Sequence, residues 1–363
     1  MRKSWLTAGT ILAGFVASLP AHAQNMEMTF SGSLDYQFQF ADQDQPSAGT
    51  GVNLTAVADQ SELIWDARAT ADNGLQYGAS IEWRFASNGG NGGGTFDEAY
   101  LMFGGGWGTL QVGSVDDPVD EMATGGHDVQ AHSEGFDGEF GNVYTQIGDA
   151  GFLGTEASSD DANKIAYYTP NFGGFEAGFA FTPESNVSLQ SQGTDTSTAT
   201  NILESSLAYG VELGDVAVTA SLGYRHADAD DNTSGSDVED VNAWRTGVKV
   251  GFGPIELGAG YGYNGDSACQ KGTQCDAGEN VQLGLGWDYG AGRFAVGYAT
   301  GWETNNDGTE DSIDVYNISM DYTVTEGLIA YGDLVHARSD NGTAGAANEN
   351  EGTVLLVGTA VFF

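Results

Sequence analysis

Basic residues are scarce in this sequence, whose 363 residues include 11 Lys and Arg against 51 Asp and Glu. This balance argues against nucleic acid as a partner, because binding to phosphates requires clustered positive charge. Long apolar runs are also missing: after the amino end, no segment approaches the roughly 18 consecutive apolar residues of a membrane-spanning helix. The sequence also lacks the G-x-S-x-G, P-loop and H-E-x-x-H motifs, so no common catalytic signature points to an enzyme.

The amino end has the pattern of an export signal. Basic residues at Arg2 and Lys3 precede a largely apolar stretch at 6–19, and Ala21-His22-Ala23 is an A-x-A cleavage site. We expect residues 1–23 to be a secretory signal peptide and residues 24–363 to form one exported domain. Loss of the two basic residues leaves nine basic groups against 51 acidic ones, a net charge of −42.

The composition of the exported part favours a β-barrel. The sequence contains 55 Gly, 15 Tyr and 18 Phe, yet its mean hydropathy is only −0.25. Helical membrane proteins are much more apolar, whereas a barrel alternates lipid-facing and lumen-facing residues and so has an average hydropathy near that of soluble proteins. From Met28 to Phe40, every second residue is apolar or glycine and the intervening residues are polar, as expected for a strand between lipid and water.

Sixteen segments show this kind of alternation. The last of them ends the sequence on an aromatic residue, with Leu355, Val357, Val361 and Phe363 on one face, which is typical of the terminal strand of an outer-membrane barrel. The sequence therefore predicts an all-β fold, a 16-stranded antiparallel transmembrane β-barrel. The expected strands are 28–40, 60–72, 74–86, 95–103, 107–113, 162–170, 173–182, 200–213, 215–227, 241–252, 254–264, 279–290, 292–302, 312–324, 326–337 and 351–363.

The connections between these segments alternate in length. Even-numbered strands lead into tight Gly and Asn or Asp turns, such as Asp72-Asn73-Gly74, while odd-numbered strands lead into long polar connections. Short periplasmic turns and long extracellular loops have this arrangement in barrels. An exported soluble β-sandwich or β-helix would also alternate, but it would not need the regular difference in loop length.

Four parts of the sequence resemble the trimeric general diffusion porins of Gram-negative outer membranes. They are residues 28–36, the block 97–113, the segment 164–175 and the terminal Phe363, and they occur in the family's order. The resemblance covers nearly all of the exported chain. It implies a barrel in the cell outer membrane, a homotrimer, and a third external loop that folds into the barrel and narrows the pore.

The connection at 114–161 is the longest, and loops of this length are usually functional or disordered. Its many carboxylates are interspersed with aromatic residues such as Phe136, Phe140 and Tyr144, which could anchor it against a wall. The resemblance makes it the constriction loop, and an external lid is the alternative. Its acidic candidates for the constriction are Asp116, Asp117, Asp120 and Glu121.

Most of the few cations fall at positions predicted to face the lumen. Avoidance of lipid is enough to explain this placement. A sharper hypothesis is that Arg68 and Arg84 oppose the loop carboxylates across the pore and create a transverse field. Ser114 stands where many porins carry an arginine, so with the acidic excess we expect a preference for cations. The predicted basic wall consists of Arg68, Arg84, Arg225, Arg245, Lys249 and Arg293.

The two cysteines, Cys269 and Cys275, lie close together in a predicted external loop of an exported protein, so we expect a disulfide. Structural zinc would need further ligands. We interpret His127 and His132 as solvated loop residues. Acidic clusters near 228–240 and 305–311 could bind Ca²⁺ or bridge through divalent ions to lipopolysaccharide, but neither fits an EF-hand loop, so we interpret them as a solvated acidic rim, and no cofactor is expected otherwise.

These observations predict a water-filled channel that passes small hydrophilic solutes and ions down their gradients. A channel specific for one substrate is the nearest alternative. A barrel enzyme such as a protease or lipase is an alternative of another class, although no Ser-His-acid arrangement is evident. A purely structural or adhesive barrel would conduct no ions.

Overall fold

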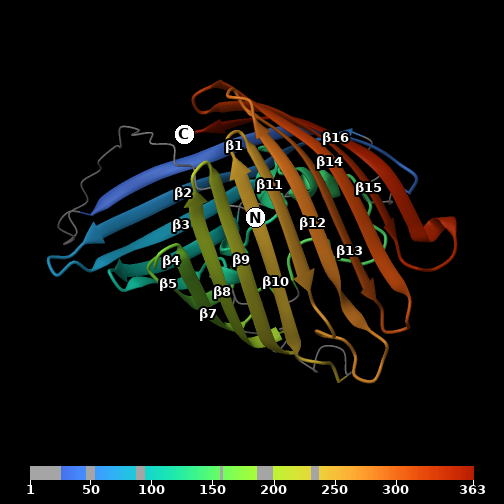
Figure 1. Cartoon of the computed structure of the whole chain (residues 1–363), viewed down its shortest axis with the longest axis horizontal. Coiled ribbons are helices and arrows are strands. Elements are labelled where there is room, and N and C mark those ends of the chain that lie inside the picture. The colour runs from blue at the N-terminus through green and yellow to red at the C-terminus, as the bar shows by residue number, and fades with distance from the viewer. Residues whose placement is uncertain (1–25, 46–53, 87–94, 156–157, 186–198, 230–236) are drawn as a thin grey trace.

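A computed structural model describes residues 26–45, 54–86, 95–155, 158–185, 199–229 and 237–363. The predicted signal peptide, 1–23, lies outside these residues. Sixteen strands follow one another around a closed ring in which sequence neighbours are antiparallel, so the predicted architecture is confirmed (Figure 1). No helix in the described part of the chain is both long and apolar enough to cross a bilayer.

The strands are β1 (Glu27–Gln43), β2 (Leu54–Thr70), β3 (Gln76–Ala86), β4 (Thr95–Gly105), β5 (Gly108–Ser114), β6 (Asn163–Tyr168), β7 (Phe175–Glu184), β8 (Ala199–Leu213), β9 (Val216–Ala229), β10 (Val241–Phe252), β11 (Ile255–Tyr263), β12 (Asp276–Asp288), β13 (Arg293–Thr304), β14 (Glu310–Thr325), β15 (Leu328–Asp340) and β16 (Glu349–Phe362). A short 3-10 helix, η4 (Ala346–Asn348), precedes β16.

The ring closes between the first and last strands. Phe38 of β1 lies opposite Val357 of β16, and the antiparallel register extends from Ser33 to Gln43. At the end of the seam, the backbone N–H of Gly32 donates to the carbonyl of Phe363 at 2.9 Å, and the N–H of Phe363 donates to the carbonyl of Gly32 at 3.0 Å. The terminal residue therefore completes the ladder, and the sheet has no free edge between β1 and β16.

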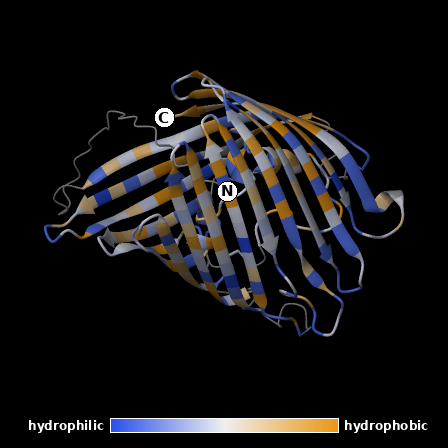
Figure 2. Cartoon of the chain, viewed as in Figure 1, coloured by the Kyte–Doolittle hydropathy of each residue, from blue (hydrophilic) through white to orange (hydrophobic). Residues whose placement is uncertain are grey.

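Alternation along the strands separates an apolar exterior from a polar interior, as Figure 2 shows by the alternating colours along each strand. In β1, Phe30 and Phe38 are 59% and 54% exposed, whereas Gln37 and Gln39 are 3% and 0% exposed. An exposed phenylalanine is unfavourable in water but suits a surface that faces lipid.

Strand ends differ from the prediction in several places because strands extend beyond the alternating apolar belt. β2 begins at Leu54 rather than near residue 60, since residues 54–58 continue the ladder opposite 36–40 of β1. β12 and β16 likewise begin earlier than predicted. Backbone pairing needs no apolar side chain, so hydropathy underestimates strand length outside the lipid zone. The predicted short turns and long loops alternate as expected.

Candidate functional site

Loop 3, the connection between β5 and β6 (residues 115–162), folds into the barrel instead of projecting from it (Figure 1). It contains α1 (Pro118–Glu121) and the 3-10 helices η1 (His127–Val129), η2 (Gly135–Asp137) and η3 (Glu139–Asn142). Along its outgoing limb, α1 contacts β7 to β9, η1 contacts β11 and β12, and η2 contacts β13 to β15. The loop thus follows one side of the inner wall.

The returning limb follows the same side of the barrel. The Tyr144 hydroxyl donates to the carbonyl of Asn350 on β16 at 2.9 Å, and the N–H of Asp149 donates to the Asp311 carboxylate on β14 at 2.8 Å. Nearer β6, the amide of Asn280 on β12 donates to the Gly154 carbonyl at 3.1 Å. Both limbs therefore lie against the wall.

Inward-facing glycines make room for loop 3. At each of these positions, an added Cβ would lie less than 3.0 Å from an atom of the loop, which is closer than van der Waals contact permits. For example, a Cβ on Gly247 of β10 would meet the Thr124 carbonyl, and one on Gly301 of β13 would meet the Gly151 carbonyl. The set comprises Gly178, Gly223, Gly247, Gly258, Gly262, Gly284, Gly286, Gly297 and Gly301.

The two limbs meet at a neck, which we define as Asp117, Asp120, Thr155 and Ser158. Arg225 of β9 lies between them with a fully buried side chain. Its Nη2 lies 2.6 Å from Asp117 Oδ2 and 3.0 Å from Asp120 Oδ2, and its Nη1 donates to Thr155 Oγ1 at 2.6 Å. One guanidinium therefore holds both limbs to the barrel.

The local sequence orients the first carboxylate of the neck. Asp117 is the N-cap of α1, and its Oδ1 accepts hydrogen bonds from the N–H groups of Val119 and Asp120 at 2.8 and 3.2 Å. Pro118 occupies the first helical position, where its missing N–H costs nothing. With Oδ1 engaged by the helix, Oδ2 is left to meet Arg225 and the Ser158 hydroxyl.

The two neck carboxyls have opposite pKa shifts. Burial acts to raise the pKa of Asp120, but the guanidinium groups of Arg225 and Arg245, the latter 2.6 Å from its Oδ1, hold that pKa well below its usual range. Burial raises the pKa of Asp117, and the negative charge of Asp120 raises it further. Asp120 thus remains ionised well into the acidic range.

The far turn of loop 3, residues 136–147, is held by apolar contacts. Phe136 and Val143 are fully buried, and Phe140 and Tyr144 are nearly so. They pack on inward-facing apolar residues. The alternation predicted a polar lumen face, but this part of the lumen wall is apolar. The wall residues of this core are Ala41, Ala299, Ile313, Val315, Val335, Ala337, Val354 and Leu356.

Neutral hydrogen bonds accompany this core. Gln43 of β1 donates from Nε2 to the Val143 carbonyl at 2.7 Å and accepts from the Thr145 N–H at 2.9 Å. Tyr144 reaches Ser339 of β15, and burial raises the pKa of its phenol to about 12. The far turn therefore depends little on charge.

Arg68 and Arg84 lie on the early strands as predicted, but each has a partner of its own. Arg68 lies 2.6 Å from Asp66, and Arg84 lies 2.6 Å from Asp97 and 3.8 Å from Glu62. These partners belong to β2 and β4, so both guanidinium groups are engaged within the wall.

The expected cross-pore arrangement needs correction at two loop residues. Asp117 and Asp120 pair with Arg225 and Arg245 on the wall behind them, because the cap of α1 turns the Asp117 carboxylate toward β9. Asp117 is fully buried and cannot line the lumen. Asp116 donates its N–H to Glu98 at 3.4 Å, and Glu121 is exposed.

Two other predicted wall cations share one partner, Glu256 of β11. Lys249 of β10 lies 4.0 Å from Glu256. Arg293 of β13 contacts Glu256, lies 3.0 Å from Asp288, and donates from Nε to the Val129 carbonyl of loop 3 at 3.0 Å. Arg225, Arg245 and Arg293 thus hold the loop.

A β-bulge makes the wall of β2 to β4 strongly acidic. Opposite β3, the register moves from Ala99–Ile81 to Phe96–Trp83, so the two residues Asp97 and Glu98 face one residue, Glu82. The carboxylates of Asp97 and Glu98 contact inward groups, since they meet Arg84 and the N–H of Asp116. Alternation alone would have placed one of the two on the lipid side.

A barrel with a loop folded into its lumen is the arrangement of a channel, and the sequence gives the family. Residues 8–342 match the family described as Gram-negative porin. The chain belongs to the Gram-negative porin family. This porin is an outer-membrane channel of a Gram-negative bacterium. A search of curated proteins found no significant match.

Solved structures share the fold at low sequence identity. The anion-selective porin from Comamonas acidovorans has a TM-score of 0.65 and 18% identity, and the match covers 93% of this porin and 100% of that chain. OmpT of Vibrio cholerae in a trimer form has a TM-score of 0.63 and 14% identity, and the match covers 94% of this porin and 100% of that chain. The channel DcaP of Acinetobacter baumannii has a TM-score of 0.62 and 14% identity, and the match covers 93% of this porin and 97% of that chain. At this identity, the likeness shows the fold alone.

The two loop histidines of the porin contact the barrel wall, which corrects the interpretation of both as solvated loop residues, although 24% of the His132 side chain is exposed. His127 is buried, and its Nδ1 lies 2.5 Å from Oε1 of Gln282 on β12. His132 Nε2 lies 3.1 Å from Asp35 Oδ2 of β1, and its ring packs edge-on against Tyr331. Both side chains attach the outgoing limb to the wall.

Lys164 of β6 is a functional residue that the sequence analysis missed. It is buried, and its Nζ donates to the carbonyls of Val115 and Asp160, at opposite ends of loop 3. Beside it, burial and the nearby Asp116 raise the pKa of Asp161 to about 9. The exposed neighbour Ile165 faces outward, so Lys164 faces the lumen, but its role follows only from the path of the loop.

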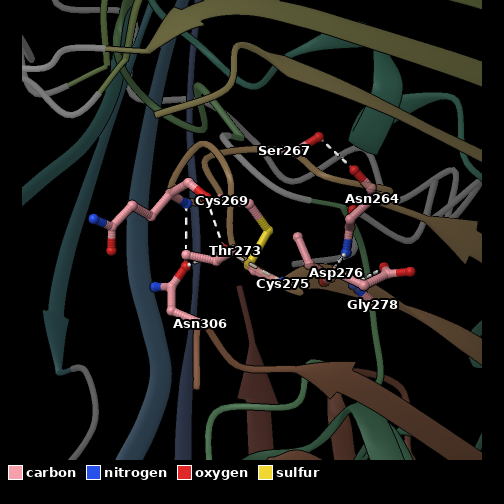
Figure 3. The surroundings of a disulfide bond; sticks show 10 residues. Asn264, Ser267, Cys269, Thr273, Cys275, Asp276, Gly278 and Asn306 are labelled. Carbon is pink, nitrogen blue, oxygen red and sulfur yellow. Dashed lines mark hydrogen bonds between the residues drawn. A yellow bond between two sulfur atoms is a disulfide. The ribbon is translucent and has the colours of Figure 1, made fainter. Parts of the chain in front are cut away.

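The predicted disulfide, Cys269–Cys275, is present in the external loop between β11 and β12, with a Cα–Cα distance of 5.6 Å (Figure 3). The loop it closes lies beside two others. The Cys269 carbonyl accepts from the Glu239 N–H at 2.8 Å, and Asn306 accepts from the Thr273 hydroxyl at 3.1 Å. The disulfide thus stabilises the extracellular rim.

Carboxylate clusters in the described residues share only Asp311 with those that the sequence suggested for Ca²⁺. Three groups have ligand oxygens within 4.8 Å of one another. In the third, Asp311 already accepts from Asn305 and from the Asp149 N–H, both at 2.8 Å. Residues 230–236 of the other predicted cluster lie outside the described residues, and Ca²⁺ binding stays a prediction. The groups are Glu62, Glu82 and Asp97; Glu98, Asp116 and Asp161; and Asp149, Glu303 and Asp311.

Proposed function

We propose that this porin is a passive diffusion channel for small hydrophilic solutes and ions, and that it catalyses no reaction. The observation that carries the proposal is loop 3, which is fastened to one side of a closed 16-stranded ring. Sixteen strands enclose a lumen wide enough for water. A loop fastened to the wall narrows such a lumen, and diffusion of solutes through it requires no coupling to energy.

We further propose that the channel prefers cations. The neck carboxylates Asp117 and Asp120 are compensated by Arg225 and Arg245, so they contribute little field to the lumen. Loop 3 packs mainly on β7 to β9 and β11 to β16, and it meets the wall of β2 to β4 at its start, where the Asp116 N–H donates to Glu98. This wall carries five inward carboxylates, Glu62, Asp66, Glu82, Asp97 and Glu98, against two guanidinium groups, Arg68 and Arg84. An excess of fixed negative charge raises the local concentration of cations.

Reversal potentials in planar bilayers across a KCl gradient test this proposal. We expect the sign of a cation-selective channel, with a preference that falls as the Debye length shrinks from about 10 Å at 0.1 M to about 3 Å at 1 M. Combined Glu62→Gln, Glu82→Gln and Asp97→Asn should lower the preference. The matched control, Asp266→Asn, Asp307→Asn and Glu310→Gln, removes three exposed carboxylates of the extracellular side.

The outcomes separate the two parts of the proposal. An absence of conductance would contradict the channel, while an anion-selective wild type would contradict only the preference. Equal effects of the two triple variants would show that the wall of β2 to β4 does not set selectivity. Block by one solute at low concentration would indicate a substrate-specific channel instead.

We also propose a homotrimer, as the family resemblance implies. The OmpT structure, described as a trimer form, shows that a chain of this fold can assemble in that way. The apolar exterior allows such contacts, although it does not specify their number. Native mass spectrometry from mild detergent should give three copies, and a single-copy species alone would contradict the assembly.

A further inference from the structure

Arg225 differs from the other lumen arginines because it contacts both limbs of loop 3. We infer that Arg225 is a positioning residue of the channel, whose guanidinium fastens the two limbs to β8 and β9 and thereby fixes the width of the lumen. The inference rests on the proposed channel function. Its basis is the position of the residue at the neck, where the loop enters and leaves the lumen.

The guanidinium serves partners from three parts of the chain at once. Nη2 meets the outgoing limb at Asp117 and Asp120, and Nη1 meets the returning limb at Thr155. Nε donates to Glu204 of β8 at 2.9 Å, which fixes the guanidinium on its own wall. A planar fork of five donors can bind such a set, whereas a lysine ammonium on a flexible stem can satisfy only part of it.

Burial makes this attachment hard to replace. The side chains of Arg225, Asp117 and Glu204 are all 0% exposed. Water therefore does not compete for the guanidinium in the folded state, and loss of the arginine would remove the cation that contacts two buried carboxylates. The returning limb would lose its Thr155 contact at the same time, which frees both limbs from one point on the wall.

Arg225→Gln tests the inference in single-channel recordings. We expect mean conductance to rise about twofold, with larger current fluctuations, because the freed limbs no longer occupy a fixed part of the lumen. Arg225→Lys should show a smaller rise in conductance, since lysine keeps the positive charge but lacks the planar guanidinium with its five donors. Arg338→Gln is the matched control, because it removes a guanidinium of β15 that is 58% exposed and lies 3.6 Å from Glu349, outside the neck. It should leave conductance and fluctuations unchanged.

A second variant separates positioning from the cost of uncompensated charge. Arg225→Gln alone should lower the temperature at which the folded barrel shifts to the unfolded position on SDS gels. Combining it with Asp117→Asn and Glu204→Gln removes the buried charges together, so this temperature should return toward the wild-type value. The conductance of the triple variant should stay as high as that of Arg225→Gln, because the contacts between limbs are still missing. Wild-type conductance in this folded variant, or in folded Arg225→Gln, would overturn the inference. A wild-type protein that conducts nothing would instead reject the proposed function.

Discussion

The neck and the far turn of loop 3 are attached to the same barrel by different forces. At the neck, a buried arginine and its neighbour Arg245 bind the carboxylates of Asp117 and Asp120. At the far turn, Phe136 and its apolar neighbours pack against inward residues of β13 to β16, and the hydrogen bonds to Gln43 of β1 join neutral groups. The attachment at the neck consists of directional ion pairs, and the attachment at the far turn consists of close-packed apolar side chains.

This difference predicts which conditions each attachment responds to. Ion pairs depend on the ionisation of both partners and, where water reaches them, on salt. Apolar packing depends on side-chain volume and is nearly insensitive to either. The neck should therefore respond to charge and the far turn to volume.

The largest expected effect comes from a cavity at the far turn. Phe136→Ala removes a fully buried ring whose atoms would lie 2.5 Å from a Cβ on Gly297. Such truncations cost about 3–5 kcal/mol. We expect faster proteolysis of loop 3 in folded protein and larger current fluctuations, equally at 0.1 and 1 M KCl.

Phe152 provides the control for that variant, because it packs only partly buried against the same core. Phe152→Ala should cause a smaller change of the same kind. Wild-type protease resistance in Phe136→Ala would show that the far turn is not held by its apolar core.

A smaller effect with a different dependence is expected at the neck. Asp120→Asn weakens the contacts to Arg225 and Arg245, but the Asp120 side chain is 33% exposed, so we expect a loss of about 1–3 kcal/mol, below the value for a fully buried pair. The difference from wild type should shrink between 0.1 and 1 M KCl, measured by proteolysis of the loop in folded barrels. Glu121→Gln, which neutralises the exposed next residue of α1, should be near wild type at both concentrations. A loss of protease resistance that is the same at both KCl concentrations would contradict an attachment of the neck by ion pairs.

The barrel itself was predictable from the sequence, but the attachments of loop 3 were not. Alternation reports which face a residue occupies, so it correctly placed Phe30 and Phe38 outside and Arg225 inside. It carries no information on which lumen residues meet across the interior. The pairing of Arg225 with Asp117 and the apolar inner positions such as Ile313 depend on the path of the loop, and the inward placement of both Asp97 and Glu98 depends on a bulge.

Asp161, near the end of loop 3, should make the free energy of unfolding of the protein depend on pH. The pKa of Asp161 is raised to about 9, so the folded protein keeps a proton that the unfolded chain releases near pH 4. Stability should therefore fall as pH rises from about 4 to about 9. The slope is at most about 1.4 kcal/mol per pH unit, and smaller because the carboxyl is only partly buried.

Heat unfolding in detergent at pH 5, 7 and 9 measures this effect. Asp161→Asn should flatten the fall of the unfolding temperature, because its amide does not titrate. Asp160→Asn changes the adjacent, exposed carboxylate and should keep most of the slope. A wild-type unfolding temperature that is constant or rises across this range would contradict the assignment.

The smallest effect on the channel is expected from the extracellular rim, which contacts neither attachment of loop 3 in the interactions described above. Cys269→Ser with Cys275→Ser opens a short covalent loop, which should cost roughly 2 kcal/mol locally, since a disulfide mainly restricts the unfolded chain and this one encloses few residues. The contacts of this loop with Glu239 and Asn306 should loosen, detected as faster proteolysis near residue 270. Conductance and selectivity should stay at wild-type values, because the constriction is positioned by the neck and the far turn.

Reduced wild-type protein is the matching control and should behave as the double variant does. Two free thiols in unreduced wild type, measured by intact mass after alkylation, would reject the disulfide, and a changed conductance would mean that the rim also positions loop 3.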